Sequence, residues 1–183
     1  MEPATPPPGT KAVRTLLAWL RDLAFSVIIA VVVIVFIYQP VKVEGTSMMP
    51  SLEDQERIFV NKFVYRFGIG QIERGDLVVF WYPGDPDKSY IKRVIGLPGD
   101  QVAIDRGTVS INGRPLQESY VPRQFRDFQS MPPRVVEPET YFVLGDHRNS
   151  SNDSRNWGLV PRRNIYGKAV FVYWPLEKFG PVR

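Results

Sequence analysis

The feature that most restricts the fold is an apolar run near the amino terminus, Leu23 to Tyr38, in which Ser26 is the polar exception. Sixteen residues in a helix extend about 24 Å, slightly less than the roughly 30 Å hydrocarbon core of a bilayer. Extending the segment to residues 16–41, with Arg21 reaching back to the interface, supplies the missing length. The sequence therefore predicts a single transmembrane anchor over residues 16–41.

A cleaved secretory leader is the main alternative, because it also combines basic residues with an apolar core. The residues after the run, Gln39-Pro40-Val41-Lys42, contain no small-x-small cleavage pattern, which favours an uncleaved anchor. The cations before the run outnumber those just after it, so the positive-inside rule predicts a cytoplasmic amino terminus and an extracytoplasmic bulk. Residues 1–15, which begin with a proline-rich stretch, are expected to form a disordered cytoplasmic tail.

Residues 42–183 consist mainly of short apolar stretches separated by glycine and proline, such as the turn signal Asn112-Gly113. No stretch after Tyr38 has sustained helical periodicity, so we expect an all-β domain, either a barrel or packed sheets. Residues from about 105 to 139 show weak alternation in their second half and are expected to form an insertion or cap. Seven segments are predicted strands: Arg57–Val64, Asp76–Trp81, Tyr90–Ile95, Gln101–Ile104, Thr108–Ile111, Thr140–Leu144 and Lys168–Trp174.

Composition removes several kinds of chemistry from consideration. The chain has no cysteine, which excludes disulfides and thiolate nucleophiles, and its one histidine, His147, excludes a zinc site built from several imidazoles. The net charge of +4 is not gathered into long basic runs, so nucleic acid is not an expected partner. A modest positive charge does suit an anionic lipid surface.

Ser47 is the candidate nucleophile, since it lies nine residues beyond the apolar run in a segment bounded by glycine and proline. Serine attacks at neutral pH only when a neighbouring base takes its proton. Lys92 lies in a mostly apolar predicted strand, and burial there would lower its pKa from about 10.4 towards neutrality. A triad of Asp146, His147 and Ser47 is the competing assignment, but adjacent chain neighbours rarely orient one another as a triad requires.

Four segments in order behind the apolar run resemble the sequence boxes of bacterial type I signal peptidases: Gly45–Leu52, Gly75–Val78, Tyr90–Asp100 and Gly145–Arg155. The resemblance extends from the anchor to about Trp174. It implies a signal-peptidase-like β-barrel or sheet domain and a membrane-anchored serine endopeptidase. The implied activity removes signal (leader) peptides from exported preproteins after small residues, with Ser47 as nucleophile, Lys92 as general base and no cofactor or metal.

The resemblance also assigns supporting residues. Ser151 is expected to hydrogen-bond the Lys92 amine, and Asp153 and Arg155 to form an ion pair that braces their loop. By analogy, pockets for small substrate side chains are expected to be lined by Val43, Met48, Tyr90 and Ile91.

Two backbone amides are candidates for stabilising the oxyanion of the tetrahedral intermediate. The Ser47 N–H is the first. Some family members use a serine hydroxyl at the position of Gly45, which has none, so the second candidate is a backbone amide made accessible by Gly45.

The implied location is the plasma (inner) membrane, with preproteins, membrane lipid and a nearby secretion translocon as partners. Aromatic residues around Phe67 are expected to rest on the lipid interface. Two alternatives compete with this interpretation. A LexA-like self-cleaving Ser–Lys protease would carry a DNA-binding helix-turn-helix where this chain has a predicted span, and a non-catalytic anchored β-domain would only bind peptides.

Overall fold

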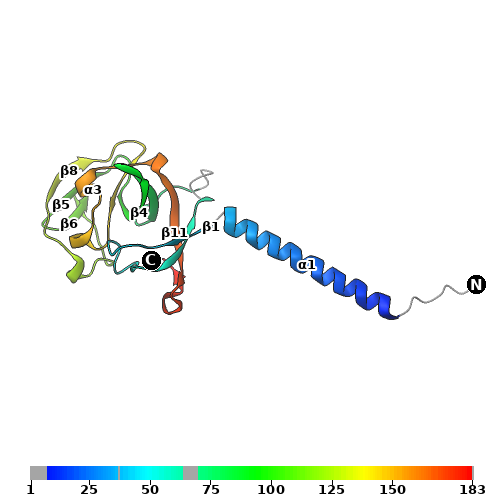
Figure 1. Cartoon of the computed structure of the whole chain (residues 1–183). Coiled ribbons are helices and arrows are strands. Elements are labelled where there is room, and N and C mark those ends of the chain that lie inside the picture. The colour runs from blue at the N-terminus through cyan, green and yellow to red at the C-terminus, as the bar shows by residue number, and fades with distance from the viewer. Residues whose placement is uncertain (1–7, 37, 64–69, 183) are drawn as a thin grey trace, which may run out of the picture. The chain divides into compact units, whose positions relative to one another are not determined.

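The computed structural model describes residues 8–36, 38–63 and 70–182, and the chain divides into two compact units, Met1–Ile37 and Tyr38–Arg183 (Figure 1). The first unit contains one long helix, α1 (Pro8–Phe36). Its stretch Val13–Val33 is long and apolar enough to cross a membrane. Side chains such as that of Trp19, 74% exposed, have no protein core around them, which suits a helix surrounded by lipid.

The boundaries of α1 differ from the expected ones. The helix begins at Pro8, inside the expected tail of residues 1–15, because proline fits the first turn of a helix, where its missing N–H has no partner to lose. It ends at Phe36, and Tyr38–Lys42 form a strand rather than the last part of the anchor. Residues 1–7 of the expected tail lie outside the described residues.

The second unit is built on an antiparallel sheet with strand order β1-β2-β11-β3-β4-β9-β10, and β12 pairs with β11. Its central strands β3 and β4 carry continuous buried stretches, because both of their faces are covered. The strands of this sheet are β1 (Tyr38–Lys42), β2 (Arg57–Asn61), β3 (Leu77–Tyr82), β4 (Asp85–Gly96), β9 (Thr140–Leu144), β10 (Val160–Pro161), β11 (Ile165–Trp174) and β12 (Gly180–Pro181).

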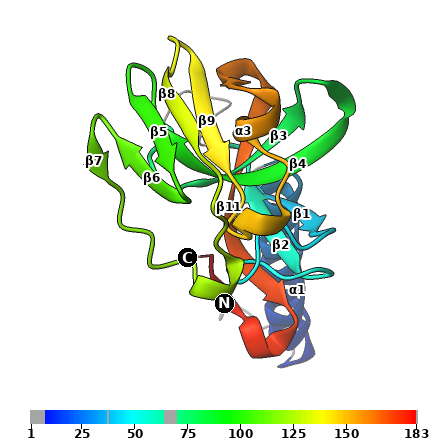
Figure 2. The ribbon, with the colours of Figure 1, turned by 90° about the vertical axis from the view of Figure 1, so that its left-hand side faces the viewer.

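A second antiparallel sheet has the order β7-β6-β5-β8 and lies beside β9 (Figure 2). Buried Ile95, Phe142 and Leu144 of the first sheet form one core cluster with apolar residues of the second, such as Val109. Its strands are β5 (Gln101–Asp105), β6 (Thr108–Ile111), β7 (Arg114–Pro115) and β8 (Met131–Val135). Short helical turns complete the unit: α3 (Ser154–Trp157), η1 (Arg123–Phe125), η2 (Arg148–Ser150), η3 (Arg162–Asn164) and η4 (Leu176–Lys178).

The all-β prediction is confirmed, and each of the seven predicted strands coincides with an observed one within the described residues. Residues 105–139 are more than a cap, since they supply three strands of the second sheet and buried core residues such as Val136. Strand β1 was not predicted because residues up to 41 were assigned to the anchor, and β8 was not predicted because it lies in a proline-rich segment. Each lies at a sheet edge, where a missing N–H costs no ladder hydrogen bond. The expected lipid contact around Phe67 falls outside the described residues.

Candidate active site

Ser47 lies in a tight turn that is anchored by buried side chains. Gly45, with φ of +92°, adopts a left-handed conformation that glycine tolerates without strain. The side chains of Met48 and Leu52, 1% and 0% exposed, are buried in the core beneath β1 and β2. The turn therefore fixes the backbone on both sides of Ser47 and leaves its hydroxyl half-buried at the protein surface.

Lys92 of β4 reaches the same place from the first sheet. Its Nζ lies 2.6 Å from Ser47 Oγ and 5.5 Å from the centre of the Tyr90 ring. Only 4% of Lys92 is exposed, and this burial lowers the pKa of its amine to about 8, against the opposing effect of the negative charges on Asp153 and Asp146. An amine with this pKa is partly uncharged near neutral pH and can take a proton from the serine.

A cavity of about 370 Å³ opens at this pair. Three of the four residues expected to bind substrate line it, namely Val43, Tyr90 and Ile91. Met48 does not, because its side chain points into the core and is 1% exposed. The remaining lining residues are Val41, Lys42, Glu44, Ser47, Ile58, Val79, Ser89, Lys92, Asn152 and Tyr166.

The loop of residues 145–155 holds the nucleophile turn. The His147 backbone N–H donates to the Ser47 carbonyl at 3.1 Å, and the His147 ring Nδ1 lies 3.0 Å from the Thr46 carbonyl. The Asp146 carboxylate is bound to the Arg93 guanidinium instead of the imidazole. The triad of Asp146, His147 and Ser47 is therefore wrong, because its acid and its imidazole are both bound elsewhere.

The three expected supporting residues differ in what they contact. Asp153, fully buried, and Arg155 form the expected ion pair at 2.7 Å, and Asp153 also accepts the Gly145 N–H at 3.1 Å. The Ser151 hydroxyl is buried and has no hydrogen-bond partner within the described ranges, so the expected bond to the Lys92 amine is not formed here. A buried hydroxyl left unpaired is uncommon in proteins and marks a position where a further contact is expected.

The expected amide at Gly45 is not available to an oxyanion. Its N–H donates to the Asp54 carboxylate at 2.8 Å, so that assignment is wrong. The Ser47 N–H, in contrast, donates no hydrogen bond to any residue in the part of the chain that the structure describes. Of the two candidate donors, the Ser47 amide alone is open to a substrate.

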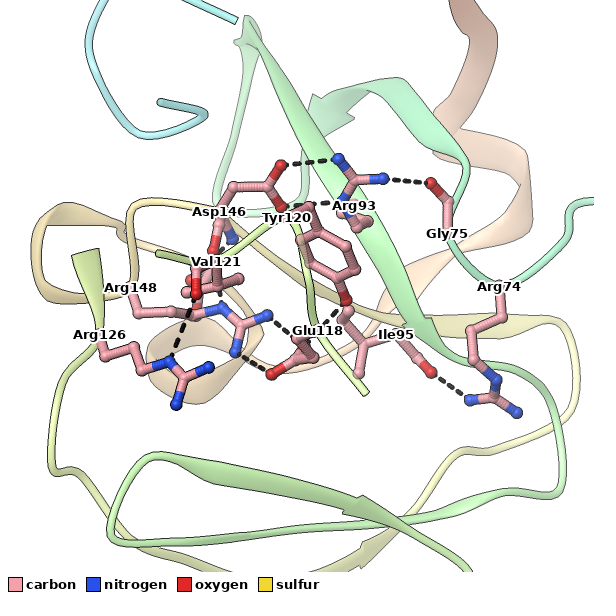
Figure 3. Close-up of polar contacts among 12 residues, drawn as sticks. Arg74, Gly75, Arg93, Ile95, Glu118, Tyr120, Val121, Arg126, Asp146 and Arg148 are labelled. Carbon is pink, nitrogen blue, oxygen red and sulfur yellow. Dashed lines mark hydrogen bonds and ion pairs between the residues drawn. The ribbon is translucent and has the colours of Figure 1, made fainter. Parts of the chain in front are cut away.

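Next to Lys92, the sequence analysis missed a buried charge network (Figure 3). Arg93 donates to both Asp146 oxygens, at 2.9 and 2.7 Å, and to the Gly75 carbonyl at 2.9 Å. The Tyr120 ring lies 4.1 Å from the Arg93 guanidinium. The available signal was two adjacent cations, Lys92 and Arg93, in the mostly apolar stretch Tyr90–Ile95. Successive side chains of a strand lie on opposite faces, so one of the two cations needs a partner on the face away from Ser47.

The segment between β7 and β8 extends this network to the loop of residues 145–155. Glu118 accepts two hydrogen bonds from the Arg148 guanidinium, at 2.8 and 2.5 Å, and a third from the Tyr120 hydroxyl at 2.9 Å (Figure 3). Asp127 of the same segment pairs with Arg155. Buried bidentate pairs of this kind fix geometry, so the segment braces the loop that holds Ser47.

Replacing Asp146 with alanine is expected to destabilise the protein strongly, because it leaves the Arg93 guanidinium, 5% exposed, without its charge partner. Breaking one side of a buried ion pair costs about 3–5 kcal/mol of the free energy of unfolding. Urea unfolding of the detergent-solubilised full chain measures this loss. Asp105→Ala is the matched control, since Asp105 is 81% exposed beside Arg106 and its removal is expected to have little effect. Equal stability of the two variants would contradict the prediction.

Comparison with known proteins identifies the family that this chain matches. Residues 16–174 match the family described as signal peptidase, peptidase S26. Signal peptidase I of Leptolyngbya laminosa is 38% identical, over 97% of this chain and 92% of its own length. Signal peptidase I of Bacillus licheniformis is 36% identical, over 93% and 95%. A crystal structure of a signal peptidase I from Enterococcus faecalis V583 is 31% identical, with a TM-score of 0.48 over 54% of this chain and 96% of that one.

The chain belongs to the signal peptidase family, peptidase S26. It is accordingly an enzyme, a hydrolase of the serine endopeptidase class, and its family membership supports the removal of signal peptides from preproteins. A signal peptidase with one apolar amino-terminal helix is consistent with membrane anchoring. The two alternatives fit poorly, since the described part of the first unit is one apolar helix rather than a helix-turn-helix, and the family is enzymatic.

Proposed function

We propose that the protein is a membrane-anchored signal peptidase in which Ser47 is the nucleophile and Lys92 the general base. The observation that carries this proposal is the 2.6 Å separation of Lys92 Nζ and Ser47 Oγ, together with a Lys92 pKa lowered to about 8. Serine requires a base within hydrogen-bond reach, and an amine becomes one only when it loses its proton near the working pH.

The proposed reaction follows from these positions. Neutral Lys92 takes the Ser47 proton as Oγ attacks the scissile carbonyl carbon, and the Ser47 N–H stabilises the oxyanion that forms. The Lys92 ammonium then donates that proton to the departing amine, which leaves an ester on Ser47. Lys92 next takes a proton from a water molecule, which attacks the ester. As the Oγ–carbon bond breaks and the new carboxyl end leaves, the Lys92 ammonium returns that proton to Ser47 Oγ. Each proton that Lys92 accepts is passed on within the cycle, so the reaction needs only these two side chains, the Ser47 N–H and water.

Substrate is proposed to bind as an added strand. The segments Val41–Glu44 and Ser89–Lys92 both line the cavity. In the described residues β1 pairs with β2 alone, and β4 pairs with β9 only from Arg93 onward, so each segment has a free backbone edge. An extended leader peptide between them would gain main-chain hydrogen bonds from both. Apolar Val43 and Ile91 at the floor favour small side chains before the scissile bond.

Supporting roles are proposed for three further residues. The Asp153–Arg155 pair holds the loop of residues 145–155 against the nucleophile turn. The unpaired Ser151 hydroxyl is proposed to accept a hydrogen bond from the Lys92 amine when that amine carries the serine proton. A second oxyanion donor is not assigned, because the Gly45 amide is bound to Asp54.

The proposed location follows from α1. We propose that α1 spans the plasma membrane once, with Lys11 and Arg14 near its cytoplasmic end, and that the β-domain lies outside the cytoplasm near the secretion translocon. The substrate would then reach the site with its own apolar segment still in the bilayer.

The pH dependence of preprotein cleavage by the full chain in detergent tests the proposal. Because the base must be uncharged, kcat/KM is expected to fall about tenfold for each pH unit below the Lys92 pKa, and to level off above about 8. Gel-based cleavage between pH 5 and 9 measures the profile, with Ser47→Ala as the inactive reference. A flat profile, or undiminished cleavage by Ser47→Ala, would rule out the dyad.

A further inference from the structure

A second groove of about 710 Å³ adjoins the catalytic cavity and shares two lining residues with it, Ser89 and Tyr166. Three cations line this groove, Lys62, Arg162 and Arg163, and no carboxylate does. Neither Lys62 nor Arg163 forms an ion pair within the described residues. The groove is therefore a concentration of positive charge that the protein leaves largely unneutralised.

The aromatic residues of the groove indicate that it lies at the membrane–water interface. The rings of Trp81 and Tyr166 pack with their centres 4.7 Å apart, and Trp81 is 45% exposed. Tryptophan and tyrosine concentrate at the level of lipid headgroups, where an apolar ring and a polar edge are both accommodated. Gln39, another lining residue, follows Phe36 by three positions, so chain connectivity alone keeps it within about 11 Å of the end of the apolar helix.

We propose that this groove binds the phosphate of an anionic lipid headgroup. The guanidinium groups match a phosphate in charge and hydrogen-bond geometry, Lys62 adds a point charge, and the Trp81–Tyr166 pair packs against the glycerol and upper acyl region. Binding there sets the catalytic cavity beside a lipid headgroup, at the depth where a membrane-inserted leader emerges. The inference rests on the proposed membrane anchoring, but not on the identity of the catalytic base.

Lipid selection by the full chain tests the proposal. The protein is reconstituted in phosphatidylcholine membranes that contain trace spin-labelled phosphatidylglycerol or spin-labelled phosphatidylcholine, and electron paramagnetic resonance gives the relative association of the two lipids. Removing two cations with K62Q/R163Q is expected to lower the preference for phosphatidylglycerol at least fivefold, the contribution of about one juxtamembrane cation. Arg162 is left in place because it donates to the Ile165 carbonyl.

The control variant R106Q/R114Q removes the same charge from the second sheet, where Arg106 and Arg114 are exposed, and is expected to keep the preference of the wild type. The basic residues of α1, Lys11, Arg14 and Arg21, contribute equally to every variant. An unchanged preference in K62Q/R163Q, or an equal fall in both variants, would overturn the proposal.

Two further measurements test whether the groove binds soluble phosphate or substrate polypeptide instead of a lipid headgroup. If 10 mM inorganic phosphate at constant ionic strength abolishes the preference, the groove binds soluble phosphate and the lipid assignment is wrong. If K62Q/R163Q raises KM for a short peptide in lipid-free detergent, the groove holds substrate polypeptide and the lipid assignment is again wrong. A wild-type chain that selects phosphatidylglycerol but cleaves no peptide would count against the proposed function alone.

Discussion

Lys92→Met is expected to lower kcat for preprotein cleavage by about a thousandfold, within the range that a positioned general base contributes. Methionine has a similar length and suits the buried site, so the variant removes the amine without leaving a large cavity. Initial rates at pH 8 measure the effect. His147→Ala is the discriminating comparison, because the His147 ring contacts the Thr46 carbonyl and the Phe125 ring rather than Ser47 Oγ, and a loss below tenfold is expected. The reverse order of losses would contradict a Lys92 base.

The Lys92→Met variant also tests whether the folded protein keeps the Lys92 amine uncharged. The folded pKa of Lys92 is lowered to about 8 from 10.5, so between these values the unfolded chain binds a proton that the folded chain does not. Unfolding free energy of the wild type therefore rises with pH across this window, by up to about 3 kcal/mol. Lys92→Met is expected to lack this rise and to be no less stable than the wild type below pH 8. This comparison also shows that lost activity is not lost folding.

The strands that sequence patterns predicted are those whose signal is local. β3 and β9 are apolar runs bounded by turn residues, and the Ser47 and Lys92 segments were recognisable by their resemblance to the sequence boxes of a known family. The features that the sequence patterns missed have a common cause. Whether a strand lies at a sheet edge, and which charge pairs with which, is set by the tertiary structure. Proline in β8 argues against a strand until its edge position is known.

The site residues show the same difference between local signals, which the sequence carries, and contacts set by the tertiary structure, which it does not. Nothing local in Glu118 indicates that it binds Arg148, 30 residues away, and nothing in Gly45 indicates that its amide is bound to Asp54. Met48 was assigned to a substrate pocket by analogy with the family, yet neighbouring side chains of a tight turn point in different directions and this one enters the core. The sequence thus implied that Ser47 and Lys92 meet, and only the structure shows which further side chains meet and which backbone groups remain free for catalysis.

Gly145→Ala is expected to reduce kcat by about a hundredfold while the protein still folds. A Cβ atom at Gly145 would lie 2.5 Å from the Ser47 carbonyl oxygen and 2.2 Å from Ser151 Oγ, which is closer than atoms pack. The Ser47 backbone or the loop of residues 145–155 must therefore shift, and a displacement near 1 Å at a reacting group costs about a hundredfold in rate. The rate of Ser47 acylation by an active-site-directed acylating inhibitor measures the effect directly.

Gly180→Ala is the matched control, since it adds the same methyl group where no atom lies within 4 Å and the backbone is not left-handed. Acylation by this variant is expected to equal that of the wild type. The unfolding midpoint of Gly145→Ala separates the two ways in which the methyl group could act. Slow acylation of a chain that stays folded means that the close packing of Gly145 against the Ser47 carbonyl and Ser151 sets the position of the catalytic groups. A loss of activity that only follows the unfolded fraction means that this contact serves stability, and the positioning role would be wrong.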